Sequence, residues 1–509
     1  MKKRALLYMT DNSTAFEFAG KLSENGYEIL SFGETYELLS LNGFGVISLE
    51  DLAGDEKGPD GKAHLMSGSV VYGITTDRSD IEQINYIREQ GIEPIDIVAV
   101  NLENFDELCK ISAEGGKSLL SMIDIEKINF INLAAKNYED VTVVIDKNDF
   151  SLVVSEIEKG GEVSLETRGM LAAKAVSYTT HYLALLNEYL RGSLTSVLYP
   201  EYITRTYKRV SKLESGENAY QSAAFYSEQG FDEKVELFKN KNISYSSIAD
   251  ISFAYGIIKE IESPCAVAVK REIVSGAAVG VDAYDACTKA FRAEGTNMGG
   301  GVLVMNCLID RKTAHEIMKF PFELAVAPGA DSDAESVLAE KEGLKLVLTG
   351  TNEVEKADPY IYKKVLGGLL VQNTDIKPLN VNELLYVTAK RPDENEESDL
   401  VFGFNIAKGS KSVSAVLVKD GQAVGIGQGQ LDIEKAFKTA CDTAGEKARG
   451  SVLATDSVIF SPELVNLLNE SGITAIIQPG GALNTQDIID ICNENEISMM
   501  VTNTTQYKN

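Results

Sequence analysis

A lysine–arginine pair, Lys270-Arg271, follows an apolar run from Cys265 to Val269. The run predicts a buried strand, so both side chains are expected at a strand end. An arginine guanidinium keeps its proton at any working pH and therefore cannot act as a general base. Lys270 could move a proton only if its surroundings favour the neutral amine. A surface or ion-paired lysine is the competing interpretation, so the pair alone leaves the chemistry open.

Polar residues also follow the first strands expected in the chain. Residues 5–9 form an apolar run, and Asp11 to Thr14 after it can cap a helix ending near Gly26. A second strand, Tyr27 to Ser31, leads to Gly33 and Thr35. In parallel sheets, ligands lie at the carboxyl ends of strands, and helix N-termini there offer N–H groups to anions. We therefore expect an anion near Asp11–Thr14 and Gly33–Thr35.

Other motifs of catalysis and cofactor binding are incomplete. Gly115 to Ser118 resembles the end of a phosphate-binding loop, but Ile111 occupies the position that requires glycine. The run Gly425 to Gln430 ends in glutamine where a dinucleotide motif has glycine. The three histidines and six cysteines show no metal-ligand spacing. No metal site is proposed from them, and we expect free thiols in a reducing compartment.

Composition narrows the class of protein. The chain has 509 residues, with a formal net charge of −28 and a pI of about 4.6. A nucleic-acid surface needs clustered cations, so nucleic acid is excluded as a partner. An anionic ligand must find a local positive pocket against the overall field. No run approaches the ~20 apolar residues of a membrane span, and we expect a cytoplasmic protein without a membrane partner.

The alternation of strands and helices predicts an α/β fold with a parallel, doubly wound sheet in the first part of the chain. Further strands are expected at Val70–Ile74, Ile95–Asn101 and Val141–Ile145. Helices fit Ser118–Asn137 and Ser164–Arg191, and residues 192–212 form a connector.

The remainder is again α/β. Asp420-Gly421 lies between two apolar strands, which is a strong hairpin signal. Blocks at about 250–350 and 405–505 could be two halves of similar architecture, although no clear repeat relates their sequences. Strand-like runs occur at Ala266–Lys270, Val302–Asn306, Leu324–Ala327, Leu344–Leu348, Val452–Ala454, Ala475–Ile477 and Met499–Thr502.

Several phrases, in one consistent order, resemble the bifunctional purine biosynthesis family. They are Arg4-Ala5-Leu6-Leu7, Asp96–Leu102, Ala134-Ala135-Lys136-Asn137, Gly216-Glu217-Asn218 with Gln221, Ser244–Asp250, Gly367–Gln372, Gly425–Gln430 and Ile477–Gly481. The family combines formyl transfer from 10-formyltetrahydrofolate to a purine ribotide (AICAR) with cyclisation to inosine monophosphate (IMP). The resemblance implies a methylglyoxal-synthase-like cyclohydrolase domain at residues 1–192. It also implies a formyltransferase domain at 193–509, built from two cytidine-deaminase-like halves, and a homodimer that shares the formyltransferase site.

The resemblance also assigns site residues. Catalytic positions are Lys270, Arg271, Asp124 and Lys136. Substrate-binding positions are Asp11, Thr35, Lys62, His64, Asn101, Gly216, Glu217, Asn218, Gln221, Gly300, Gly301 and Pro479.

Many family positions are changed in this chain. The family's proton-shuttling histidine after Lys270 is Arg271, and its tyrosine after Asn-Leu is Glu103. Its Gly-Gly after Asp-Ile is Glu126-Lys127. Four cationic positions become neutral or acidic at Asn12, Asn132, Glu214 and Ile433, and candidates to replace them are Lys62, Lys127 and Arg271.

Two functions remain open from the sequence. One is a divergent bifunctional enzyme that acts on purine ribotides and folate, with slow formyl transfer because Arg271 cannot take a proton. The other is a catalytically impaired paralogue that binds a nucleotide-like ligand or a partner protein in regulation.

Overall fold

The computed structural model describes residues 2–54, 64–115, 118–194, 197–228, 242–292, 300–350, 358–482 and 485–508. Lys62 therefore lies outside the described residues. The chain forms two compact units, one within Met1–Lys208 and one within Arg209–Ser227 and Phe231–Asn509. The change of unit falls inside the expected connector, and the domain boundary at residue 192 stays a prediction. No described helix is long and apolar enough to cross a membrane.

The first unit is a parallel sheet of five strands in the order β3-β2-β1-β4-β5, as the sequence predicts. The strands are β1 (Lys3–Tyr8), β2 (Tyr27–Ser31), β3 (Val46–Ser48), β4 (Ile97–Val100) and β5 (Thr142–Val144). The helices are α1 (Asn12–Glu24), α2 (Gly33–Leu41), α3 (Leu49–Ala53), α4 (Gly68–Thr75), α5 (Ile81–Glu89), α6 (Phe105–Gly115), α7 (Leu119–Met122), α8 (Ile125–Lys136), α9 (Phe150–Gly160) and α10 (Leu165–Leu194).

Helices cover both faces of this sheet, so its strands are apolar on both sides. Helices α1 and α9 pack one face through residues such as Phe18 and Val153. Helices α4, α8 and α10 pack the other through residues such as Val70, Phe130 and Ala175. This arrangement leaves the two ends of the strands as the places where polar side chains can gather.

Two predicted elements of the first unit are wrong or incomplete. The run Val70–Ile74, expected as a strand, lies in helix α4, because the Ser67 hydroxyl accepts the Val70 N–H at 3.4 Å and starts a helix. Its buried residues Val70, Gly73 and Ile74 follow helical spacing. The expected helix Ser118–Asn137 is interrupted before Asp124, whose carboxylate caps α8.

The second unit contains a sheet of 11 strands in the order β12-β11-β10-β8-β9-β17-β16-β18-β19-β20-β15. Its strands are β8 (Cys265–Lys270), β9 (Ile273–Val279), β10 (Val302–Met305), β11 (Leu324–Ala327), β12 (Lys345–Leu348), β15 (Leu385–Tyr386), β16 (Ala415–Lys419), β17 (Gln422–Gly427), β18 (Val452–Thr455), β19 (Ala475–Gln478) and β20 (Ser498–Val501). Two separate hairpins are β6 (Lys208–Leu213) with β7 (Ala223–Ser227), and β13 (Tyr360–Val365) with β14 (Gly368–Asn373).

The large sheet consists of two halves with the same topology, which confirms the expected similarity of the two blocks. In each half an antiparallel hairpin, β8–β9 or β16–β17, is followed by one antiparallel strand and then by two parallel strands. Gln422 of β17 pairs with Ala278 of β9 where the halves meet. The specific likeness to cytidine deaminase stays a prediction.

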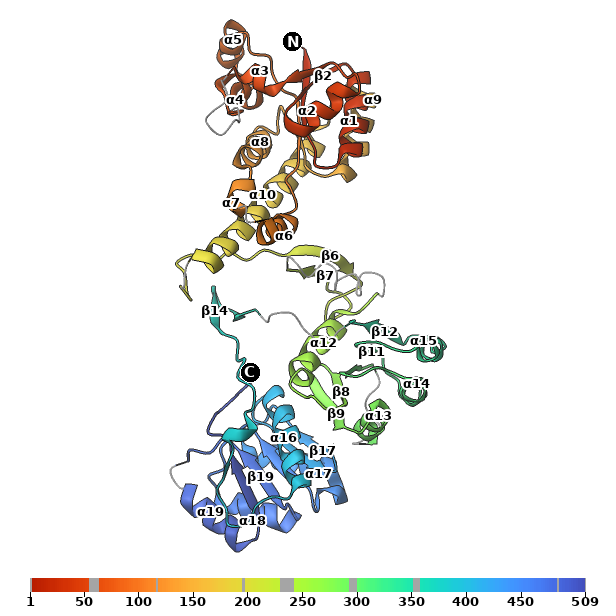
Figure 1. Ribbon diagram of the computed structural model, residues 1–509, viewed down its shortest axis with the longest axis vertical. Coiled ribbons are helices and arrows are strands. Elements are labelled where there is room, and N and C mark those ends of the chain that lie inside the picture. Colours follow the sequence, from red (N-terminus) through yellow and green to blue (C-terminus); the bar gives the residue numbers. More distant parts are fainter. Residues whose placement is uncertain are drawn as a thin grey trace. The chain divides into compact units, whose positions relative to one another are not determined.

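Helices cover the second sheet in the same pattern in both halves. Helices α12 (Tyr245–Ile258) and α16 (Glu394–Gly409) share one core on one face (Figure 1). The opposite face carries α13 (Ala283–Arg292), α14 (Arg311–Ile317) and α15 (Ser332–Ala339) in the first half, and α17 (Ile433–Ala444), α18 (Pro462–Ser471) and α19 (Thr485–Glu494) in the second. Each half therefore has one long helix on one face of the sheet and three helices on the opposite face.

Candidate functional site

The carboxyl edge of the first sheet is the first place where predicted site residues meet. The chain runs from β1 to β2 and β3 on one side, and then returns to β4 on the other side of β1. Doubly wound sheets bind ligands in the crevice at such a reversal, which here falls between the carboxyl ends of β1 and β4. The crevice is bridged by one hydrogen bond, from the Thr10 N–H to the Asn101 side-chain oxygen at 2.8 Å.

Asp11, Thr35 and Asn101 lie together around this crevice. The Asp11 carboxylate caps α1, accepting the Ser13 and Thr14 N–H groups at 3.1 and 3.3 Å. The Ser13 hydroxyl, which donates to the same carboxylate at 2.7 Å, lowers the pKa of the Asp11 carboxyl together with Thr14. The Thr35 hydroxyl is buried and accepts the Met9 N–H at 3.2 Å, which ties β1 to α2. All three side chains position loops, and the backbone N–H groups of α1 and α2 face the same edge.

A buried ion pair lies at the same edge. Among the buried residues that the structure describes, Lys127 is the one lysine or arginine, with 5% exposure. Its ammonium donates to Glu103, lies 3.6 Å from the centre of the Tyr8 ring and lies 3.9 Å from Asp124. The Tyr8 hydroxyl donates to Glu103 at 3.1 Å, and burial together with Glu103 raises the pKa of Tyr8. Glu103 thus neutralises the cation best placed to meet an anion.

The other predicted residues of the first unit are less closely joined. His64 is exposed, and its Nδ1 lies 3.7 Å from Glu126, on the first turn of α8. Asp124 caps the N-terminus of α8, whereas Lys136 is exposed at the last residue of that helix. A helix of 12 residues is about 18 Å long, so the structure does not bring Lys136 to Asp124.

In the second unit, Lys270 and Arg271 lie where β8 turns into β9. Arg271 and Glu272 both adopt a φ of 55°, in the left-handed region that disfavours residues other than glycine and asparagine. The buried Asp250 carboxylate of α12 holds this turn, accepting the N–H of Arg271 at 3.0 Å and of Glu272 at 2.5 Å. Burial raises the pKa of Asp250, and the two N–H groups oppose that shift. Asp250 therefore holds the turn through two of its backbone N–H groups.

The register of the sheet brings the predicted glycines beside this turn. Val302 pairs with Val269, so Gly301 follows on directly opposite Lys270. Gly300 has a φ of 78°, and its N–H donates to Pro321 at 2.9 Å. Neither glycine carries a side chain, and a methyl group placed on Gly300 would meet no atom within 4 Å.

The remaining predicted residues lie on other elements. Gly216, Glu217, Asn218 and Gln221 form the turn between β6 and β7, in which the Gln221 side-chain oxygen accepts the Asn218 N–H at 3.0 Å. Pro479 follows β19 in the second half of the large sheet. Asp250 and Lys508 were not predicted as site residues. Asp250 ends a matched sequence phrase, which was a usable signal, but no pattern marks Lys508.

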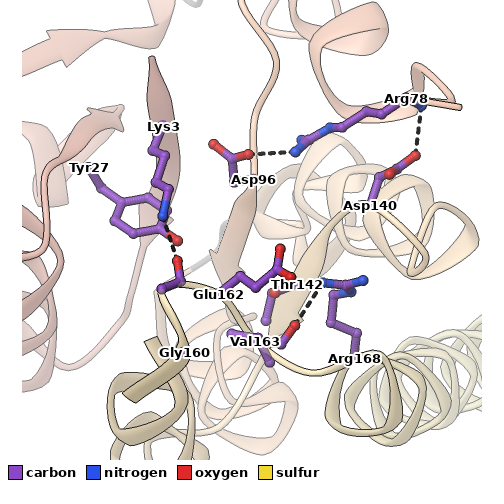
Figure 2. Close-up of a pocket in the computed structure, with 11 residues that line it drawn as sticks. Lys3, Tyr27, Arg78, Asp96, Asp140, Thr142, Gly160, Glu162, Val163 and Arg168 are labelled. Carbon is purple, nitrogen blue, oxygen red and sulfur yellow. Dashed lines mark hydrogen bonds and ion pairs between the residues drawn. The ribbon is translucent and has the colours of Figure 1, made fainter. Parts of the chain in front are cut away.

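A cavity of about 340 Å³ opens at the opposite, amino edge of the first sheet (Figure 2). Its cations are bound within the chain. Arg78 pairs with Asp96 at 2.6 Å, Lys3 donates to the Gly161 carbonyl at 2.5 Å, and Arg168 donates to the Val163 carbonyl at 2.7 Å. No predicted site residue lines this cavity, and its internal pairs bind the strand ends together.

Comparisons with known proteins match two families along the chain. The AICARFT/IMPCHase bienzyme family matches residues 134–443, and the MGS-like domain family matches residues 14–131. Proteins named bifunctional purine biosynthesis protein PurH, from Acetivibrio thermocellus and Thermoanaerobacter sp., are 36% and 37% identical to this chain over the full length of both chains. A crystal structure of ForH covers 37% of this chain and 98% of its own, with 25% identity and a TM-score of 0.33.

Proposed function

Because the chain belongs to the AICARFT/IMPCHase bienzyme family, we propose that it carries out both family reactions in de novo purine biosynthesis. The amine of AICAR takes the formyl group of 10-formyltetrahydrofolate, and the formylated ribotide (FAICAR) then closes to IMP. The observation that carries this proposal is similarity over the whole chain to relatives that bear the bifunctional name.

The residues at the two sites support one reaction in each unit. We assign cyclisation to the carboxyl edge of the first sheet, because Asp11, Thr35 and Asn101 converge there. We assign formyl transfer to the β8–β9 turn, where Lys270 lies opposite Gly301. The family's folate cosubstrate would approach the same turn. All six cysteines are unpaired, which supports a cytoplasmic location.

One observation favours a second candidate, the non-catalytic paralogue. Arg271 stands where the family has its proton-shuttling histidine, and a guanidinium cannot accept a proton. A chain that had lost formyl transfer would still fold in this way, because Asp250 binds the turn through its backbone.

Product analysis on the purified protein decides between the two. The chain is given AICAR with 10-formyltetrahydrofolate, and separately FAICAR alone, and products are measured by mass spectrometry at pH 7 and pH 9. We expect IMP from both mixtures, with formyl transfer as the slower step at pH 7. Absence of product from both mixtures, with an intact family member active in parallel, would favour the non-catalytic paralogue.

A further inference from the structure

Formyl transfer needs a group that removes a proton from the ribotide amine, and Arg271 cannot be that group. A second lysine, Lys508, lies beyond β20 and reaches back to helix α12. Its Nζ lies 4.1 Å from the centre of the Phe253 ring. A methyl group placed on Gly256 would lie 3.4 Å from the same nitrogen. The Lys508 amine is therefore packed against the face of α12 that carries Phe253 and Gly256.

The same face of α12 holds the β8–β9 turn. Asp250, which accepts the N–H groups of Arg271 and Glu272, lies three residues before Phe253. Residues three apart on a helix are neighbours, with Cβ atoms about 5–6 Å apart. The Lys508 amine and the β8–β9 turn thus contact neighbouring residues of α12, Phe253 and Asp250.

Contacts of the tail fix Lys508 in this place. Residues 411 and 508 form a parallel bridge, and the Ser412 N–H donates to the Lys508 carbonyl at 3.0 Å. The Lys411 ammonium in turn lies 3.6 Å from the Glu272 carboxylate, on the turn itself. The tail, the turn and α12 therefore meet at one cluster of charged groups.

The surroundings of Lys508 make the neutral amine more accessible than it is in an ordinary lysine. Burial lowers the pKa of Lys508 to about 8, Glu272 opposes the shift, and Lys259 and Lys411 add to it. These three groups are the charges that face Lys508: Lys259 at the end of α12, Glu272 on the turn and Lys411 in the segment before β16. At pH 7 about one amine in ten would be neutral, and near pH 8 about half.

We propose that the Lys508 amine accepts the proton of the ribotide amine during formyl transfer. The proposal rests on the formyltransferase function proposed above. The ribotide nitrogen forms a bond to the formyl carbon, and the bond from that carbon to N10 of the folate breaks. Lys508 takes the proton that the ribotide nitrogen loses and returns it to N10, so that charge and atoms balance.

The test compares Lys508→Met with the wild-type chain across pH 6–10, with kcat and KM for formyl transfer measured separately. In the wild type, the rate should rise with pH and level off above about 8. Lys508→Met should lose this rise and about 10²–10⁴-fold in kcat, which is the usual contribution of an acid–base group. Lys312→Met is the matched control, because Lys312 also lies over an aromatic ring, 3.5 Å from the centre of Tyr284, but is exposed.

Two further variants separate a chemical role from a structural one. Adding Arg271→His to Lys508→Met should restore part of the rate, with a midpoint near the ordinary imidazole pKa of about 6.5. Gly256→Ala places a methyl group against the amine and should move the wild-type midpoint to lower pH, because added burial favours the neutral form.

Cyclisation of FAICAR serves as the internal reference, because it is assigned to the other unit. Unchanged cyclisation with a lost formyl-transfer profile supports the proposal. A Lys508→Met enzyme that keeps the wild-type pH profile, or whose only change is a higher KM for AICAR, overturns it. A wild-type chain without formyl transfer instead refutes the proposed function itself.

Discussion

In the first unit, the charge that an anion would meet at the carboxyl edge of the sheet depends on a few side chains. Lys127 is buried and already bound to Glu103, with the Tyr8 ring against it. A phosphate that approaches the N-terminus of α8 must therefore compete with a carboxylate of this chain. The family places tyrosine and glycine at these two positions, so the competition belongs to this sequence.

Glu103→Gln should strengthen nucleotide binding. The amide keeps an acceptor for the Tyr8 hydroxyl and removes the charge that neutralises Lys127. Hydrogen bonds to charged groups contribute about 1.5–3 kcal/mol, so we expect a gain of about 1–2 kcal/mol, or roughly 5–30-fold in affinity for IMP. Isothermal titration of the full chain measures it, with Glu107→Gln, an exposed residue of α6, as control. An unchanged affinity would mean that Lys127 does not meet the phosphate.

The sequence predicted part of this residue-scale picture. Asp11, Thr35 and Asn101 could be placed together, because the carboxyl ends of parallel strands share one edge. The Lys127–Glu103 pair could not, because Glu103 lies in the loop after β4 and Lys127 in the first turn of α8, and no sequence pattern joins the two. Lys508 was not predicted either, because a residue near the end of the chain acquires its surroundings only when β20 and α12 are in place.

At the scale of elements, the β8–β9 turn has a counterpart in the second half of the sheet. Asp420 and Gly421, with φ values of 54° and 75°, turn β16 into β17. The buried Asp399 of α16 accepts the Gly421 N–H at 2.7 Å, as Asp250 of α12 does for Glu272. The second turn has the Asp-Gly sequence that its conformation favours, whereas the first carries Arg-Glu.

Copying the second turn into the first should stabilise the protein. Arg271→Asp with Glu272→Gly relieves two left-handed residues, each of which costs about 1–2 kcal/mol outside glycine, asparagine and aspartate. We expect a higher Tm of the second unit in calorimetry, and we expect Asp250→Asn to lower it, since the amide leaves one N–H without an acceptor. A lower Tm in the double variant would show that the Arg271 and Glu272 side chains stabilise the fold.

The two turns also show what a sequence can reveal about elements. The β16–β17 hairpin was predicted correctly, because Asp-Gly favours the positive φ values that a two-residue hairpin turn requires. The β8–β9 turn was expected only as a strand end, since Arg-Glu disfavours a positive φ and the deciding group is a distant carboxylate. Val70–Ile74 failed for a simpler reason: a short apolar run fits a strand or a helix, and the Ser67 cap decides.

At the scale of the whole molecule, the hairpin β13–β14 pairs with no further strand of the described chain. Its strands pair only with each other there, and Leu366 and Leu370 are 105% and 59% exposed. An isolated two-stranded hairpin is marginally stable in water, so this surface needs cover. The homodimer proposed from the family resemblance, with an extensive interface through the second unit, would supply it.

Charging this hairpin should separate the dimer. The wild-type chain is expected to scatter light as a dimer at micromolar concentration. Leu366→Asp with Leu370→Asp should give the mass of a monomer, because burying two carboxylates in an apolar interface is costly. Leu41→Asp, at a leucine of the first unit that is 87% exposed, should leave the mass unchanged. A wild-type monomer at this concentration would contradict the proposed assembly.

The carboxylate behind the β8–β9 turn has a consequence for how this protein can evolve. Asp250 holds two backbone N–H groups, which every amino acid except proline supplies. Position 271 can therefore exchange one side chain for another while the strands, the helix and the turn persist. Natural selection can alter the reactive group of such an enzyme without first rebuilding its scaffold, and an arginine in place of a histidine is the kind of variant that this freedom allows to survive.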